Sequence, residues 1–149
     1  MDAVSNSADT ALRARAARVV PGGMWGHLHA AKLPEGYPQF FARGEGAHLW
    51  DVDGRRFVDF MCSWGPNLLG HLHPEVEEAA ERQRRMGDCL NGPAEVMVEL
   101  AEQLVAMLPH AAWAMFQKNG TDATTTCLTI ARAATGRRKV LVARGAYHG

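Results

Sequence analysis

The 149-residue sequence has few cysteines, no excess of charge of one sign and no long apolar run. Its three cysteines, Cys62, Cys89 and Cys127, form no CxxC pair, so we expect a reducing compartment and no disulfide framework. Lysine plus arginine and aspartate plus glutamate number 16 each, so net charge attracts neither nucleic acid nor an acidic membrane surface. No segment is apolar enough to span a bilayer, and the N-terminus lacks the pattern of a secretory signal. These absences predict a cytoplasmic protein that binds neither nucleic acid nor membrane.

The familiar nucleotide-binding loops are also missing. There is no GxxxxGK[ST] and no GxGxxG, so neither nucleoside triphosphate nor dinucleotide binding is supported. What remains is an ordinary globular composition, 47% hydrophobic and 21% charged, in a chain long enough to build a core.

The first half of the sequence predicts a helix followed by a small antiparallel meander. Asp9 or Thr10 is a suitable cap for a helix that runs through Val20. Asp53-Gly54 is a strong hairpin signal between two short apolar runs. Three strands are expected, at residues 39–42, 48–51 and 56–60.

The second half changes to helical periodicity. Pro74 and Pro93 each suit a first helical position, which predicts helices over 74–85 and 93–108. Further on, the short apolar run 113–116 suits a buried strand, a helical pattern follows it up to Gly136, and 139–143 suits another strand. Residues 112–143 therefore predict a βαβ unit with parallel strands and a right-handed crossover.

The sequence ends at Gly149, shortly after the second of these strands. Two parallel strands with one helix cannot cover both faces of a sheet. We therefore expect this chain to be part of a larger domain.

The turn Asn119-Gly120-Thr121-Asp122 lies between the apolar run and the helix. A helix that begins after a strand presents free backbone N–H groups and the positive end of its dipole, which suits a phosphate dianion. Gly120 lets the backbone approach closely, and Thr121 adds a hydroxyl donor. The alternative is that Asn119 or Thr121 only caps the helix. These four residues alone leave both interpretations open.

Five segments, taken together, resemble one family: VVPGG at 19–23, GAHLWDVDGRRFVDF at 46–60, SWGPNLLGHLHPEV at 63–76, KNGTDATTTCLTIARAATGRRKVL at 118–141 and GAYHG at 145–149. In order and spacing they resemble the class III pyridoxal-phosphate aminotransferases, especially the branch around glutamate-1-semialdehyde 2,1-aminomutase. The resemblance starts near Arg18 and continues to the last residue.

The resemblance implies an α/β protein with the pyridoxal-phosphate-dependent transferase fold type I, of which this chain is the N-terminal portion. Residues 1–75 would supply the N-terminal helix, the substrate-side loop and the antiparallel meander of the small domain. Residues 76–149 would begin the large parallel-sheet domain that binds pyridoxal 5'-phosphate. In this family the sites form at a dimer interface, so a homodimer is expected.

The resemblance also implies which residues bind the cofactor. Gly120 and Thr121 match the Gly-Thr pair that holds the cofactor phosphate through backbone N–H groups and the hydroxyl. Asn119 stands where the family has Ser, and it belongs to the same turn. Tyr147 matches an aromatic residue whose ring lies against the pyridine ring. His148 follows it in the motif with a supporting role.

Two tryptophans are expected in the substrate pocket. Trp64 matches an aromatic residue of that pocket, for which core packing is the alternative. Trp25, together with Met24, would give the pocket an apolar wall. This predicts a substrate that carries a bulky or apolar group.

His29 marks a departure from the aminomutase branch. That branch carries a Ser at the position of Gly26 and, three residues later, an Arg that pairs with a substrate carboxylate, where this chain has His29. An imidazole cannot reproduce a bidentate guanidinium fork. An aminotransferase with a different substrate is therefore favoured, and the aminomutase is the alternative.

The implied reaction moves an amino group between an amino acid or amine and a keto or aldehyde acceptor. The cofactor requires a lysine that holds it and an acid partner for its pyridine nitrogen. The lysines here are Lys32, Lys118 and Lys139, and none lies in the family's lysine context. We therefore expect the catalytic lysine outside this chain, which should not transaminate alone.

Two alternatives come from other functional classes. His27-Leu28-His29 and His71-Leu72-His73 are HxH pairs, which on a strand point both imidazoles to one side, as in zinc hydrolases. No HExxH and no carboxylate motif completes such a site, so no metal is predicted. The other alternative is a non-catalytic fragment that folds only against a partner, through an exposed sheet edge and unpaired apolar helix faces.

Overall fold

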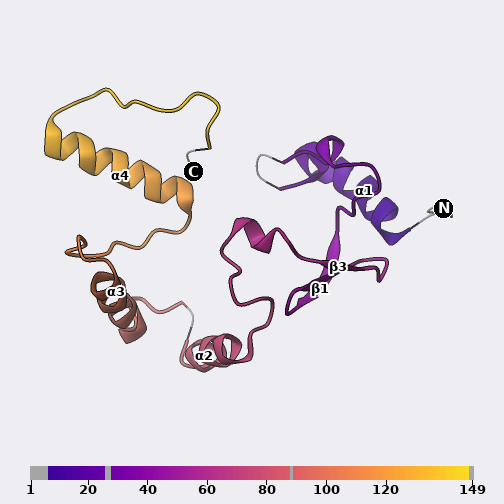
Figure 1. Cartoon of the computed structure of the whole chain (residues 1–149), viewed down its shortest axis with the longest axis horizontal. Helices are drawn as coiled ribbons and strands as arrows, with labels where there is room; N and C mark the ends of the chain where they lie inside the picture. The colour runs from indigo at the N-terminus through magenta and orange to yellow at the C-terminus, as the bar shows by residue number, and fades with distance from the viewer. Residues whose placement is uncertain (1–6, 26–27, 88, 148–149) are drawn as a thin grey trace. The chain divides into compact units, whose positions relative to one another are not determined.

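The computed structural model describes residues 7–25, 28–87 and 89–147 (Figure 1). The chain divides into two compact units, Met1–Asp88 and Cys89–Gly149. Within the described ranges, no helix combines the length and the apolar character needed to cross a membrane.

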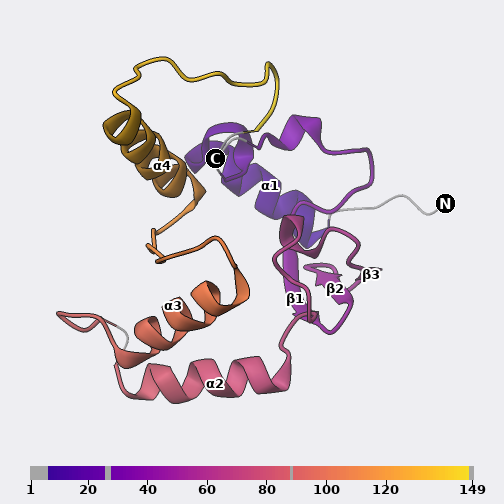
Figure 2. The same ribbon diagram turned by 60° about the vertical axis from the view of Figure 1, so that its left-hand side comes forward.

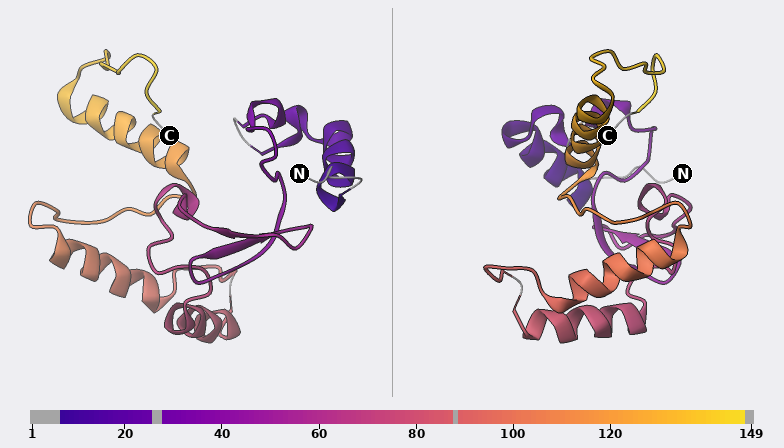
Figure 3. Two further views of the ribbon diagram at one scale, coloured as in Figure 1. Left: turned by 45° about the vertical axis from the view of Figure 1, so that its right-hand side comes forward. Right: turned by 90° about the vertical axis from the view of Figure 1, so that its left-hand side faces the viewer.

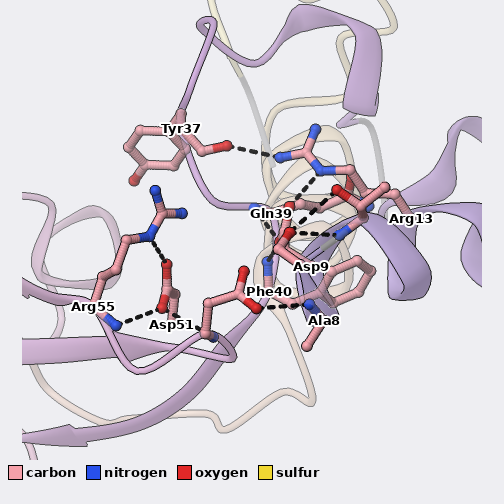
Figure 4. Close-up of polar contacts among 11 residues, drawn as sticks. Ala8, Asp9, Arg13, Tyr37, Gln39, Phe40, Asp51 and Arg55 are labelled. Atoms are coloured by element: carbon pink, nitrogen blue, oxygen red, sulfur yellow. Dashed lines mark hydrogen bonds and ion pairs between the residues drawn. The ribbon is translucent and has the colours of Figure 1, made fainter. Parts of the chain in front are cut away.

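Helix α1, Ala8–Val19, begins the first unit. Its N-cap is Ser7, whose hydroxyl accepts the N–H of Thr10 at 3.2 Å, so the predicted cap at Asp9 or Thr10 is wrong by two or three positions. Asp9 is used differently: its carboxylate accepts the N–H groups of Gln39 and Phe40, both at 2.9 Å (Figure 4). This buried carboxylate ties α1 to the segment that enters the sheet.

The sheet is a three-stranded antiparallel meander in the order β1-β2-β3 (Figures 2 and 3). The three predicted strands are confirmed, the second with the expected bounds and the others with ends shifted by up to three residues. The observed strands are β1, Phe41–Glu45; β2, His48–Asp51; and β3, Arg56–Val58.

The predicted Asp-Gly hairpin closes β2 onto β3 around a buried carboxylate. Asp51 accepts the N–H of Asp53 at 3.0 Å and that of Arg55 at 2.8 Å, and it pairs with the Arg55 Nε at 2.6 Å (Figure 4). Gly54 has φ 82°, which favours glycine there. Asp53 in turn accepts the N–H of Ala8 at 2.6 Å, which attaches α1 to the hairpin.

The remaining long helices agree with their predictions. Helix α2 spans Pro74–Arg85 as expected, and α3, Glu95–Met107, lies within the predicted 93–108. In the second unit, α4 covers Gly120–Thr135, and Gly136 ends it in the left-handed region, with φ 68°.

The predicted βαβ unit is only partly formed. Helix α4 is present, but neither 113–116 nor 139–143 is a strand in the described part of the chain. Apolar composition favours extended backbone, whereas a strand also needs a neighbouring backbone to complete its hydrogen bonds. The two segments do not pair with each other, so the predicted parallel pair is wrong for this chain.

Polar contacts, rather than a closed apolar core, hold the first unit together. Among the described residues no large apolar side chain is buried, whereas the polar residues Asp9, Gln39 and Asp51 are buried, and Asp51 is only 1% exposed. The carboxylates of Asp9 and Asp51 each accept two backbone N–H groups and pair with an arginine, so their burial is compensated. These contacts fix the loops that lead into and out of the sheet.

Candidate functional site

The turn before α4 is shaped by a reciprocal pair of side-chain contacts. The Asn119 side-chain oxygen accepts the N–H of Asp122 at 3.0 Å, and its amide nitrogen donates to the Asp122 carboxylate at 3.0 Å. Asn119 is thus the N-cap of α4, which confirms the capping interpretation for that residue. The cap also engages the Asp122 carboxylate through the Asn119 amide.

Capping by Asn119 leaves other donors at the same helix end available. The backbone N–H groups of Gly120 and Thr121 and the Thr121 hydroxyl make no hydrogen bond within residues 7–25, 28–87 and 89–147. Both residues are exposed. Three free donors at the positive end of a 16-residue helix dipole suit an anion with several oxygens. Capping and phosphate binding are therefore compatible at this turn.

Tyr147 and His148 follow much later in the second unit. Tyr147 has 78% of its surface exposed. His148 lies outside the described residues. The role of the Tyr147 ring beside a cofactor remains a prediction.

Trp64 ends a short left-handed turn, η3, Cys62–Trp64. The φ angles are 48°, 52° and 60° at Cys62, Ser63 and Trp64, and Gly65 follows at 108°. With 65% of its surface exposed, Trp64 does not have the core position that was its alternative. The turn presents the indole outward at the surface of the first unit.

Asp59, an acid that the sequence interpretation did not single out, holds this turn. Asp59 accepts the N–H groups of Met61 at 2.9 Å and Cys62 at 3.0 Å through one oxygen, and the other oxygen lies 2.8 Å from His71 Nε2. The His71 hydrogen bond, and then the Cys62 N–H, hold the pKa of Asp59 below its ordinary value. An Asp two or three residues before a turn is a recognisable Asx signal, which could have identified it.

Trp25 and His29 lie in the loop between α1 and β1. Trp25 is 72% exposed. The His29 Nδ1 accepts the N–H of Ala31 at 3.2 Å and caps the short helix η2, Ala30–Lys32. Its ring packs against Gly22, where a Cβ would come within 2.9 Å of His29 Cδ2. One ring nitrogen of His29 is therefore already engaged locally.

The His71-Leu72-His73 pair does not have the strand geometry that the metal interpretation requires. Leu72, between His71 and His73, has φ 55°, which is not strand backbone, so this pair lacks the conformation that would point both imidazoles to one side. His71 Nε2 is engaged by Asp59, and His27 lies outside the described residues. Across the described ranges, no three His, Cys, Asp or Glu side chains come together as metal ligands.

The aminotransferase class-III family model matches residues 31–149 of this chain. An aminopentol aminotransferase from Sphingopyxis macrogoltabida is 56% identical over 138 residues, which are 93% of this chain and 33% of that protein. A glutamate-1-semialdehyde 2,1-aminomutase from Chloroflexus aurantiacus is 45% identical over 136 residues, 91% of this chain and 31% of that protein. This chain thus spans about a third of the length of the curated relatives it matches.

Solved structures give the same picture. The PLP internal aldimine form of the FumI protein from Sphingopyxis sp. MTA144 superposes with a TM-score of 0.89 at 55% identity, over 95% of this chain and 34% of that one. An omega-transaminase from Sphaerobacter thermophilus superposes with a TM-score of 0.87 at 35% identity, over 98% of this chain and 33% of that one. These similarities confirm the predicted fold class, the N-terminal portion of fold type I.

Proposed function

Since the chain belongs to the class III aminotransferase family, we propose that the protein is a pyridoxal-phosphate-dependent aminotransferase. It would move an amino group from an amino acid or amine to a keto or aldehyde acceptor. The observation that carries this proposal is the set of free donors at the N-terminus of α4, which suits the cofactor phosphate.

Each proposed cofactor contact has a distinct task. Gly120 and Thr121 bind the phosphate through their N–H groups and the Thr121 hydroxyl. Asn119 keeps that turn in shape by capping α4 and engaging Asp122. The Tyr147 ring would lie against the pyridine ring, with His148 in support. When bound, pyridoxal phosphate delocalises the electrons left by departure of the substrate's α-proton.

The wider arrangement follows from family membership. Residues 1–75 would belong to the small domain and 76–149 to the large domain of a cytoplasmic homodimer. Cys62, Cys89 and Cys127 are free thiols, which supports a reducing compartment. The lysine that holds the cofactor would be none of Lys32, Lys118 and Lys139.

A trapping experiment tests the cofactor and its lysine together. The complete protein from its source is incubated with pyridoxal phosphate, reduced with borohydride, weighed by mass spectrometry and then mapped by peptide. We expect one reduced cofactor per chain, on a lysine outside these 149 residues. An adduct on Lys118 would contradict the assignment of the lysine, and absence of any specific adduct would contradict the cofactor proposal.

The amino donor is proposed to be an amine with a bulky or largely apolar body and no carboxylate beside the amino group. His29 offers no guanidinium fork for a carboxylate, and its Nδ1 is engaged by Ala31. The exposed indoles of Trp25 and Trp64 would supply apolar walls. The Sphingopyxis relative is named for an aminopentol, which also supports an amine donor. The second candidate function is that of an aminomutase. The 45% identical relative supports it, but this chain has His29 in place of the arginine that the aminomutase branch carries.

A donor panel with one substitution tests this assignment. We expect long-chain amines to react with higher kcat/KM than glutamate or aspartate. His29→Arg should shift the ratio toward the dicarboxylates by about 10-fold, because one charge-assisted pair contributes about 1.5 kcal/mol. His48→Arg, on strand β2 outside the proposed pocket, is the matched control and should leave the ratio unchanged. Dicarboxylates reacting best with the unmodified enzyme would contradict the proposed donor.

A further inference from the structure

The turn that carries Trp64 adopts an unfavourable backbone conformation. Cys62, Ser63 and Trp64 are three successive left-handed residues other than glycine. Side chains with a Cβ disfavour this region, and a run of them persists only where the surroundings impose it. The direction of the Trp64 indole therefore depends on whatever holds the turn.

The Asp59 carboxylate is the one side chain that hydrogen-bonds to the backbone at the start of this turn, within the part of the chain that the structure describes. One of its oxygens accepts the N–H groups of both Met61 and Cys62. The other turn contacts are backbone hydrogen bonds from Trp64 to Met61 and from Gly65 to Cys62, both at 2.9 Å, and from Asn67 to Cys62 at 3.1 Å. In addition, the Cys62 Sγ lies 3.6 Å from the Asp59 carbonyl oxygen. Only 6% of the Asp59 side chain is exposed, so water does not readily replace it.

His71 holds the second oxygen of Asp59 and is itself fixed to the sheet. Its backbone exchanges two hydrogen bonds with Gly46, at 2.8 and 2.9 Å. Its ring lies against Gly44, where a Cβ would come within 2.7 Å of His71 Cγ. Asp59 also donates its own N–H to Ala47 at 2.9 Å. The contacts thus run without interruption from the β1–β2 hairpin through His71 and Asp59 to the turn.

We propose that Asp59 and His71 are positioning residues that orient the Trp64 turn and thereby set the preference among amino donors. This inference rests on the proposed function, because it takes Trp64 as a wall of the substrate pocket. Neither Asp59 nor His71 needs to touch substrate or cofactor in this role.

Fluorine NMR of protein labelled with fluorotryptophan tests the orientation without requiring activity. The Trp64 signal is identified by its loss in Trp64→Phe. Asp59→Ala should shift or broaden that signal and leave the signal of Trp50 in place. Asp59→Asn keeps an acceptor for the two N–H groups and a donor toward His71, so it should restore the native signal. Asp53→Ala, the same change on the adjacent hairpin, is the matched control.

Kinetics then test whether this orientation sets donor preference. Asp59→Ala should lower the ratio of kcat/KM for a long-chain amine over alanine by about 10-fold, the size expected from one well-packed contact. In a Trp64→Ala background the same substitution should change the ratio no further. Equal effects in both backgrounds, or an unchanged Trp64 signal in Asp59→Ala, would overturn the proposal.

Two further outcomes distinguish a failure of this proposal from a folding defect and from a failure of the proposed function. If Asp59→Ala does not fold, His71→Ala removes one of the contacts and should move the Trp64 signal and the ratio in the same direction; no movement would overturn the proposal. If the unmodified protein transfers no amino group from any donor, the proposed function fails, and the Trp64 signal still decides whether Asp59 orients the turn.

Discussion

Replacing Gly120 by aspartate is expected to weaken the binding of pyridoxal phosphate by about 100-fold or more. A carboxylate within about 5 Å of a phosphate dianion costs several kcal/mol at an effective dielectric constant of about 20, and about 2.7 kcal/mol already corresponds to 100-fold. An acidic residue at the first position of a helix favours the dipole, so α4 itself should remain folded. The measurement is a titration of the cofactor-free protein with pyridoxal phosphate, followed by absorbance.

Two companion variants separate charge from fit in this experiment. Gly120→Ala adds a methyl group without charge and should weaken binding by only a few-fold. Gly92→Asp introduces the same carboxylate in the same unit, at a position where a Cβ would meet nothing within 4 Å. It should leave the affinity unchanged. Wild-type affinity in Gly120→Asp would mean that the phosphate is held somewhere other than the N-terminus of α4.

Replacing Asp9 by alanine is expected to lower the free energy of unfolding by about 2–4 kcal/mol. Asp9 is only 6% exposed, and its loss leaves the N–H groups of Gln39 and Phe40 without an acceptor, at about 1–3 kcal/mol for each buried unsatisfied group. Arg13 loses its carboxylate partner and keeps its hydrogen bond to the carbonyl of Tyr37, at 2.7 Å (Figure 4). Urea unfolding of the two proteins measures the difference.

A surface pair provides the control for Asp9. Glu78→Ala removes an exposed partner of Arg82 on α2 and should change the free energy of unfolding by less than about 0.5 kcal/mol. Equal losses in the two variants would show that burial of the Asp9 carboxylate contributes nothing of its own.

The Asp9 carboxylate also makes the free energy of unfolding depend on pH. Burial by itself raises the pKa of Asp9, but the hydrogen bonds from Arg13 and from the N–H groups of Phe40 and Gln39 more than offset it, so the pKa lies below the ordinary value of 3.8. A depressed pKa means that the stabilisation is complete well above pH 3.8 and is lost as the pH falls through the folded pKa. In Asp9→Asn, the unfolding free energy should therefore fall less steeply with acid than in the unmodified protein.

Much of the local structure could be predicted from the proline, glycine and aspartate residues that begin or end helices and turns. Pro74 and Gly136 fix one end each of α2 and α4, and Asp53-Gly54 fixes a hairpin, because each acts on the backbone beside it. The strands at 113–116 and 139–143 could not be judged in this way. Strand formation depends on a pairing partner, which no local pattern specifies.

In the candidate site, too, local features could be predicted from the sequence, whereas contacts between distant residues could not. The anion-binding turn before α4 is contiguous in sequence, so its donors could be predicted from Gly120 and Thr121. The contacts that hold the first unit connect distant residues: Asp9 reaches Gln39, 30 positions away, and Asp59 reaches His71, 12 positions away. Periodicity and turn signals report neighbours within a few residues, so the sequence places Asp9 near a helix start and Asp59 before a turn but does not identify Gln39 and His71 as their partners.

The left-handed run at 62–64 has a consequence for laboratory evolution. Glycine or asparagine at Cys62 or Ser63 would relieve the unfavourable backbone, so selection for heat resistance should find such substitutions easily. Glycine, which has no Cβ, would also let the turn sample other backbone conformations, so the direction of the Trp64 indole would be less fixed. Variants selected only for heat resistance would then accept a broader range of substrates, whereas variants selected for substrate selectivity would retain the less stable turn.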